Sequence, residues 1–277
     1  MCQIDPWAVN KERLNFWGSN SELICTIGNQ FVKKIHTQNI CKENLIYFEN
    51  YNMYVDFVCN NRNKIFPYLH YIHDTEIKID LSFKQRKQIS IPGTLGRLYS
   101  DRVHIRKQLL KEKITISDNR NFIYKLIRFG SRFVPSYGLG NPMTFSWYNL
   151  SYLRSISSAK MAYTSGTDFN IFIRKYLEIP SQSTVLLCKP PLGMSDAGFT
   201  SGVDYIDCTL VNTIDVIKSL SNDINSLRSI ANSAHNVLLR SHTLWVRAQQ
   251  LKFAIEKAVN KQYNGAYWEN GEVKHYI

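Results

Sequence analysis

Several signatures of common protein classes are absent from this sequence of 277 residues. No apolar run approaches the roughly 20 residues that a membrane-spanning helix needs. The first residues, MCQIDPWAVNKERL, lack the basic-then-apolar pattern of a secretory signal. Six cysteines are scattered without any Cys-x-x-Cys spacing, which is typical of buried thiols in a reducing compartment. These absences lead us to expect a cytoplasmic protein.

The motifs of several enzyme classes are missing as well. The sequence has no Gly-Lys-Ser phosphate loop, no Gly-x-Gly-x-x-Gly, no Ser-His-Asp signature and no Asp-x-Asp pair. The segment from His70 to Asp74 contains two histidines, but their spacing fits no strong zinc signature. In a strand, His70 and His73 would face opposite sides. We therefore predict no bound metal and no resident cofactor.

Positive charge, in contrast, is abundant. The formal net charge is +12, from 34 Lys and Arg against 22 Asp and Glu. Residues 1–87 account for +2 of it and the remaining residues for +10. Such basicity favours an anionic partner, which could be nucleic acid, an acidic membrane surface or a phosphorylated ligand. The alternative is that the charge serves only to keep the protein soluble.

Strands and helices alternate from residue 88 onward. The predicted strands are Ile89–Pro92, Met161–Thr164 and Val185–Cys188. The predicted helices are Asp101–Glu112, Asn121–Gly130, Tyr148–Lys160, Asn170–Ile179, Ile214–Leu220, one capped by Asp223, and Leu244–Val259. This alternation predicts an α/β fold with a Rossmann-like parallel sheet covered on both faces. Upstream, we predict strands at Tyr54–Cys59 and Phe66–Ile72 and a linker at Asp74–Lys87.

Three segments of this region occur in a characteristic order. Ile89–Leu110 (ISIPGTLGRLYSDRVHIRKQLL) combines a strand, a glycine turn and a helix opened by Tyr-x-x-Arg. Arg174–Pro180 (RKYLEIP) precedes an apolar strand, and residues 198–205 (GFTSGVDY) lead into another. With the helix at residues 228–242, they resemble the C-terminal, donor-binding domain of GT-B glycosyltransferases of the group 1 type, including the spore-protein-like subset.

The resemblance implies a division of the chain into three parts. Residues 88–250 would form the Rossmann-like domain that binds a nucleotide-sugar donor. Residues 1–87 would be a truncated or reduced N-terminal α/β region on the acceptor side, because they are too few for a full first domain. Residues 251–277 would be the end of the last helix and a tail.

The resemblance also implies roles for individual residues. Glu178 matches the second Glu of a Glu-x7-Glu motif, whose carboxylate accepts hydrogen bonds from the donor ribose, worth roughly 1.5–3 kcal/mol. The first Glu, which contacts the transferred sugar, is replaced by Asn170. Basic side chains would stabilise the leaving diphosphate without a metal: Arg97, Arg102, Arg174 and Lys175. The other expected donor contacts are at turns and in a loop: Gly93, Gly166, Gly198 and Phe199.

Each of these assignments has a simpler alternative. Glu178 could be a helix-end carboxylate paired with Lys175, any one of the arginines could be a solvated surface charge, and Gly166 could be a plain turn glycine. We expect a metal-independent glycosyltransferase that uses a nucleotide-diphosphate sugar and an unidentified glycan, lipid-linked or protein acceptor. A peripheral membrane contact and a partner subunit that completes the cleft are compatible with this function.

Two other functions stay open. A catalytically degenerate module that binds a sugar nucleotide or a glycan is favoured by Asn170. A nucleic-acid-binding protein is favoured by the net charge, although the basic residues are dispersed and no known binding motif occurs.

Overall fold

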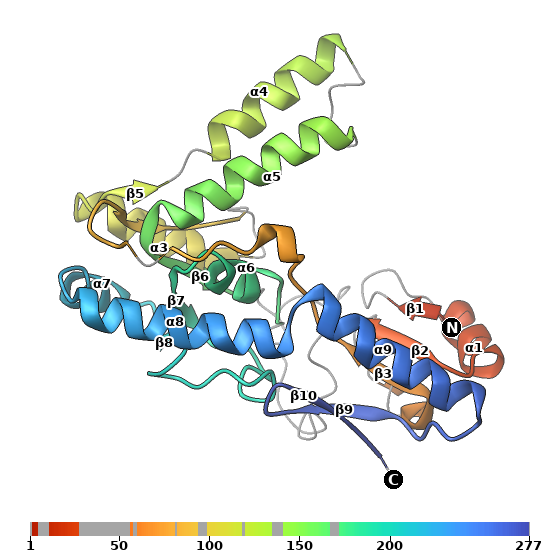
Figure 1. The fold of residues 1–277 in the computed structure, drawn as a ribbon. Coiled ribbons are helices and arrows are strands. Elements are labelled where there is room, and N and C mark those ends of the chain that lie inside the picture. Colours follow the sequence, from red (N-terminus) through yellow and green to blue (C-terminus); the bar gives the residue numbers. More distant parts are fainter. Residues whose placement is uncertain are drawn as a thin grey trace.

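The computed structural model describes residues 2–4, 11–27, 56–57, 60–80, 82–93, 99–117, 120–134, 141–166 and 172–276. A parallel sheet of five strands, in the order β5-β4-β6-β7-β8, lies at its centre (Figure 1). The strands are β4 (Lys87–Ser90), β5 (Ile116–Ser117), β6 (Ala159–Ser165), β7 (Val185–Lys189) and β8 (Ile206–Asp207). The expected α/β class with a Rossmann-like parallel sheet is confirmed.

Helices cover both faces of this sheet because its central strands are apolar on both sides. Met161 of β6 and Leu187 of β7 face one core cluster, whereas Ala162 and Leu186 face the other. The first cluster is completed by α3 (Ser100–Lys111), α7 (Thr213–Leu220) and part of α8 (Ile224–Ser241). The second is completed by α5 (Pro142–Ser157), α6 (Lys175–Ser181) and another part of α8. Parallel strands buried on both faces require such continuous apolar runs.

Several predicted boundaries agree with the structure. The predicted strands Met161–Thr164 and Val185–Cys188 lie within β6 and β7, and helix α9 spans Leu244–Val259 as expected. Asp223 caps α8, since its side chain accepts a hydrogen bond of 3.0 Å from the backbone N–H of Ser226. These elements carry unambiguous apolar periodicity or a side-chain cap.

Other boundaries were predicted wrongly. Ser100 is the first residue of α3 rather than its cap. Gly130 does not end α4, which continues over Arg120–Phe133. α5 begins at Pro142, well before Tyr148, because Asn141 accepts a hydrogen bond of 2.9 Å from the N–H of Met143. Asn-Pro is a strong helix start that outweighed the polar character of the first turn.

A smaller parallel sheet, in the order β1-β2-β3, precedes the central one. Its strands are β1 (Cys2–Ile4), β2 (Ile24–Ile27) and β3 (Ile65–Tyr68), and helix α1 (Lys11–Asn20) lies between β1 and β2 in the sequence. Two short 3-10 turns flank β3: η2 (Arg62–Lys64) comes before it and η3 (Asp74–Glu76) after it. Asp56 and Phe57 are helical, so the strand predicted at 54–59 is wrong at these two positions; its other residues lie outside the described ones. The small sheet agrees with a reduced N-terminal α/β region.

The end of the chain returns to this small sheet. α9 and the hairpin of β9 (Ala266–Glu269) and β10 (Glu272–His275) lie beside β2 and β3 (Figure 1). Ala254 of α9 packs with Leu23, Cys25 and Phe66. The Trp268 indole donates a hydrogen bond of 2.8 Å to the Pro67 carbonyl. Residues from both ends of the chain therefore build the N-terminal part of the molecule.

The two parts are joined where residues 70–76 cross residues 242–247. The N–H of Ile72 donates to the His242 carbonyl at 2.9 Å, and the N–H of Leu244 donates to the Ile72 carbonyl at 2.9 Å. The buried Arg247 guanidinium donates to the His70 carbonyl at 3.2 Å and to His242 Nδ1 at 3.1 Å. It also lies 4.5 Å from the centre of the Trp268 ring.

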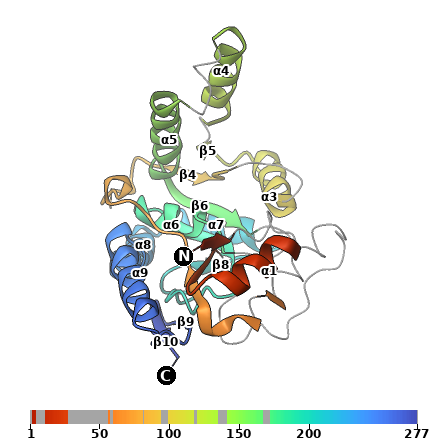
Figure 2. The same ribbon diagram turned by 90° about the vertical axis from the view of Figure 1, so that its right-hand side faces the viewer.

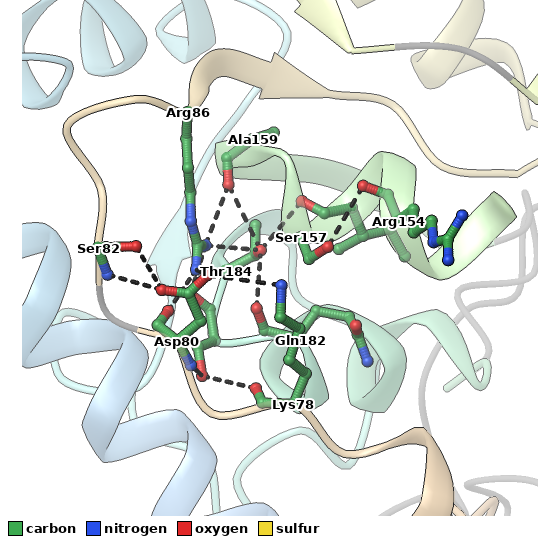
Figure 3. A network of polar contacts seen from close by, with 11 residues as sticks. Lys78, Asp80, Ser82, Arg86, Arg154, Ser157, Ala159, Gln182 and Thr184 are labelled. Carbon is green, nitrogen blue, oxygen red and sulfur yellow. Dashed lines mark hydrogen bonds and ion pairs between the residues drawn. The ribbon is translucent and has the colours of Figure 1, made fainter. Parts of the chain in front are cut away.

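The segment predicted as a linker packs at the amino ends of β6 and β7 and is hydrogen-bonded there. Figure 3 shows the network around the buried Arg86 side chain, which donates to the Ser183 carbonyl at 2.9 Å and to the Asp80 carbonyl. The hydroxyl of Thr184 donates to the Ile156 carbonyl at 3.1 Å. Residues 78–80 and 82–86 are therefore part of the packed domain, and the linker predicted at Asp74–Lys87 is wrong there. None of the helices that the structure describes combines the length and apolarity needed to cross a bilayer.

The crossing makes stability depend on pH through His242. This imidazole is 0% exposed, and burial, with Arg247 nearby, lowers its pKa to about 3. Below about pH 6.5 the unfolded chain binds a proton that the folded chain does not bind. The contribution of His242 is therefore complete above pH 6.5 and is lost progressively as the pH falls toward 3.

As the pH falls from 7.5 to 5.5, we expect the contribution of His242 to decrease the free energy of unfolding by about 1.4 kcal/mol. Urea unfolding of His242→Gln should show a pH dependence that is smaller by this amount than that of the wild type. His104→Gln, at an exposed histidine of α3, is the control and should keep the wild-type dependence. Identical pH profiles for His242→Gln and the wild type would contradict this account.

Candidate functional site

The order of strands creates a topological switch point between β4 and β6. From β4 the chain crosses to β5 on one side, whereas β6, β7 and β8 follow on the other side. At such a point the loops after neighbouring parallel strands diverge and leave a crevice at the carboxyl ends, where open α/β sheets bind ligands. Gly93 follows β4 and Gly166 follows β6, so both predicted glycines flank this crevice.

Two cationic side chains converge on Gly93. This residue has a φ of +109°, and an added Cβ would lie 2.6 Å from Arg102 Nη1 and even closer to Lys175 Cε. Only glycine adopts this backbone conformation readily and leaves this space. The structure therefore brings together Gly93 from the turn after β4, Arg102 from α3 and Lys175 from α6.

The Arg102 side chain is 0% exposed and only partly paired. Its Nη2 donates a hydrogen bond of 2.7 Å to the Ser165 carbonyl at the end of β6, and its guanidinium lies 3.9 Å from the centre of the Tyr99 ring. Nε and Nη1 have no hydrogen-bond partner among the described residues. Burial lowers the pKa of the guanidinium. An unpaired buried cation is costly, and an anion in the crevice would compensate it.

Glu178 lies on α6, three residues after Lys175, and each of its carboxylate oxygens has a partner. It is 8% exposed. Its Oε2 accepts a hydrogen bond from the Tyr152 hydroxyl of α5, and its Oε1 lies 3.7 Å from Arg174 Nη1. Arg174 also forms an ion pair with Glu76 and donates to the Tyr71 carbonyl at 3.4 Å. The sequence placed Glu178 near the end of a helix over Asn170–Ile179, whereas α6 begins only at Lys175 and Glu178 lies in its first turn. Its carboxylate is buried and oriented by two partners.

A cavity of 520 Å³ opens beside Arg174. Its lining comes from the end of β3, the segment 70–76, α5 and the start of α6, and consists of Tyr68, His70, Tyr71, His73, Thr75, Glu76, Asn149 and Arg174. Asn149 donates a hydrogen bond of 3.0 Å to Glu76. The cavity therefore lies where the N-terminal part faces the central sheet. Arg174 lines it and the next residue, Lys175, contacts Gly93, so the start of α6 connects the cavity with the switch point.

The two histidines considered as metal ligands both line this cavity. The chain has left β3 before His70, so the opposite orientation expected for a strand does not apply. His73 caps η3, with the N–H of Thr75 donating to its Nδ1 at 3.3 Å. Burial, together with Arg174 and Lys175, lowers the pKa of His70 to about 4, which keeps this ring neutral at pH 7. No three His, Cys, Asp or Glu side chains gather as a metal site within the described ranges.

The remaining predicted residues are placed differently. Arg97 and Asn170 lie outside the described residues. Gly198 packs against the C-terminal hairpin, where an added Cβ would lie 2.9 Å from Gly271 Cα. Phe199 is buried and stacks on His242 with ring centres 5.5 Å apart. Neither lines the cavity, and a role for their loop in donor binding stays a prediction.

Several residues of the site were missed by the sequence analysis. Tyr152 and Asn149 lie on α5, and Glu76 lies in the segment predicted as a linker. Their roles arise from contacts with distant residues: Tyr152 with Glu178, Asn149 with Glu76, and Glu76 with Arg174. The spacing of Asn149 and Tyr152, three residues apart on one helix face, was the one sequence signal, and by itself it is weak.

Comparison of the chain with known proteins identifies its fold. No protein-family model matches the chain, and no curated protein matches it in sequence. HepE from Anabaena in complex with UDP-glucose matches it with a TM-score of 0.54 and 9% identity over 90% of this chain and 77% of that one. A glycosyltransferase from Rickettsia africae gives 0.52 and 9% over 91% and 68%. The fold is GT-B. A complex of HepE with UDP and glucose matches with a TM-score of 0.52 and 9% identity over 90% of this chain and 76% of that one.

The close approach at Gly93 can be tested by adding a methyl group. Gly93→Ala should lower the free energy of unfolding by about 2–4 kcal/mol, from the positive φ and from displacement of the two cations. Gly202→Ala is the matched control, because Gly202 also has a positive φ, of +78°, but an added Cβ would have no neighbour within 4 Å. It should cost about 1–2 kcal/mol. Urea denaturation measures both, and equal losses would show that only backbone conformation requires a glycine at this position.

Proposed function

We propose that this chain binds a nucleotide-diphosphate sugar at the switch point and transfers the sugar to an acceptor without a metal ion. The observation that carries this proposal is the buried Arg102 guanidinium, two of whose nitrogen atoms have no partner among the residues that the structure describes, beside Lys175 at a glycine turn. A diphosphate has the charge and the acceptor oxygens that such a pocket lacks. The solved structures with this fold include complexes with UDP and UDP-glucose, which supports the choice of ligand.

In this proposal Arg102 and Lys175 contact the diphosphate. When the bond between the sugar C1 and the phosphate oxygen breaks, the leaving group takes the electron pair and gains negative charge. Fixed cations in a dry crevice stabilise that charge without reorganisation. Arg97 is a further predicted diphosphate contact.

Glu178 accepts hydrogen bonds from the ribose hydroxyls in this proposal. Its carboxylate is already oriented by Tyr152 and Arg174, so little rotational freedom is lost on binding. The sequence predicts that Arg174 contacts the diphosphate. Because its guanidinium pairs with Glu76 and Glu178, we propose instead that Arg174 positions the Glu178 carboxylate. The acceptor, a glycan, a protein or a lipid-linked molecule, would enter through the cavity beside Asn149, and a partner subunit could complete that side.

A second candidate function is a module that binds a sugar nucleotide without turnover. The replacement of the first motif Glu by Asn170 favours it, because an amide cannot take up a proton or match a carboxylate as hydrogen-bond acceptor. Release of UDP from UDP-sugars in the presence of candidate acceptors separates the two functions. Binding without release supports the module.

The donor site is tested by the thermal stability of the protein with UDP, GDP, ADP, CMP or TDP, each with and without magnesium. A ligand at 100 times its Kd adds about 2.7 kcal/mol of stability. We expect UDP to stabilise the wild type equally with and without magnesium. In Arg102→Met and Glu178→Gln, loss of a charged hydrogen-bonding group should weaken the affinity at least about tenfold.

The matched control is Arg86→Met, which removes another buried guanidinium at the opposite ends of the strands. It should lower the stability of the free protein but keep the full shift with UDP. Equal weakening of UDP binding in Arg86→Met and Arg102→Met would show a general loss of structure. No stabilisation of the wild type by any of the nucleotides would refute the donor site.

A further inference from the structure

Helices α4 and α5 form a hairpin that extends away from the central sheet. Both views show it projecting beyond the other elements, with α5 returning to the sheet and α4 lying outside it (Figures 1 and 2). Such a projection is not required by the candidate site, because Asn149, which lines the cavity, and Tyr152, which bonds to Glu178, lie at the end of α5 nearer the sheet. The outer part of the hairpin therefore needs another explanation.

The outer side of α4 is apolar and exposed. Leu126, Phe129 and Phe133 are three and four residues apart, which places them on one face of the helix. The rings of Phe129 and Phe133 contact each other with centres 5.1 Å apart, yet Phe133 is 72% exposed. Large aromatic side chains are seldom left in water in such a group.

The free half of α5 repeats this pattern. Met143, Trp147 and Leu150 are four and three residues apart and are all exposed, Met143 by 73% and Trp147 by 49%. From Tyr152 onward the residues of α5 are mostly buried, because the helix then packs on the sheet. The hairpin surface is defined by the six residues Leu126, Phe129, Phe133, Met143, Trp147 and Leu150.

The charge around the hairpin surface has one sign. Residues 120–157 contain five basic residues and no Asp or Glu. They are Arg120, Lys125, Arg128, Arg132 and Arg154. Lys125 and Arg132 are exposed and seven residues apart, so they lie on a common flank of α4 beside Phe129 and Phe133. Residues 119–167, which include the hairpin, form the longest stretch of the sequence without Asp or Glu.

We propose that the hairpin surface docks on the interface of a membrane that contains anionic lipids. Aromatic and aliphatic side chains enter the headgroup region, and flanking lysines and arginines contact lipid phosphates, which is the pattern of interfacial amphipathic helices. A second copy of the chain fits less well, because it would bring two surfaces of the same charge together. A nucleic acid would satisfy the charge but would leave the aliphatic residues Leu126, Met143 and Leu150 in water.

This docking would also orient the site relative to the membrane. Tyr152 follows Met143 by nine residues on the same helix, a distance of roughly 14 Å at 1.5 Å per residue. The cavity lining at Asn149 therefore lies within the reach of a lipid-linked molecule at the surface. The docking itself requires no nucleotide, so its test is independent of the proposed function.

Vesicle flotation tests the proposal with the full chain and two kinds of liposome. We expect binding to phosphatidylcholine vesicles containing phosphatidylglycerol, and much weaker binding to phosphatidylcholine alone or at high salt. Phe133→Ser with Trp147→Ser should lower the affinity at least about tenfold, because the apolar contacts are lost. Lys125→Glu with Arg132→Glu should have an effect of similar size.

Matched controls change the same residue types elsewhere. Trp245→Ser removes an exposed Trp of α9, and Lys84→Glu with Arg228→Glu reverses two exposed charges outside the hairpin. Both should bind vesicles within about twofold of the wild type, since they keep the hairpin surface. Vesicle binding that falls equally in controls and hairpin variants would overturn the proposal.

Two other results would also overturn it. The first is absence of wild-type binding to anionic vesicles. The second is a dimer in light scattering that Phe133→Ser with Trp147→Ser converts to a monomer, which would assign the hairpin surface to a contact between copies.

Discussion

The crossing of residues 70–76 with residues 242–247 is the constraint on which the rest of the molecule depends. Backbone hydrogen bonds at Ile72 and the buried Arg247 hold the N-terminal part against the central sheet. Without them the cavity beside Arg174 would lose one wall, because His70 and Tyr71 belong to this segment. Beyond the crossing, α9 and the C-terminal hairpin continue along β2 and β3 and supply a packing surface for these strands.

Charge is distributed unevenly in this frame, and each location has a different physical consequence. Arg86 and Arg247 are buried and donate to groups of other segments, Arg86 to the Ser183 carbonyl and Arg247 to the His70 carbonyl, so they join segments. Each of them leaves only its Nε without a partner among the described residues, whereas Arg102 leaves both Nε and Nη1, at the carboxyl ends of the strands. The larger number of unpaired donors distinguishes Arg102 from the two arginines that join segments. The basic residues of the hairpin are of a third kind, because those at Lys125 and Arg132 are exposed and flank apolar side chains.

The candidate site combines residues that sequence reasoning found with residues that it missed. Glu178, Lys175, Arg102 and Gly93 were identified because their spacing resembles a family pattern, and the structure brings the last three together at the switch point. Tyr152, Asn149 and Glu76 were missed, because Tyr152 acquires its role by contact with Glu178, Asn149 by contact with Glu76, and Glu76 by contact with Arg174, each across more than 20 intervening residues. Phe199 shows the opposite case. Its motif suggested a pocket, whereas its side chain is buried against His242.

Local sequence patterns were enough to predict the central strands β6 and β7 and the helices that carry clear caps or periodicity. The apolar runs Met161–Thr164 and Val185–Cys188, the Asp223 cap and the periodicity of α9 are local signals, since burial on both faces or a side-chain cap must be written into adjacent residues. The positions of the segment predicted as a linker, of the C-terminal tail and of the first residues of α5 became known from the tertiary structure. The sequence around Arg86 is polar and predicts a linker, but in the structure Arg86 donates hydrogen bonds to the carbonyls of Ser183 and Asp80. The C-terminal tail becomes a hairpin because the small sheet offers Pro67 and Phe66 as partners. Such contacts join distant parts of the chain, and no local pattern encodes them.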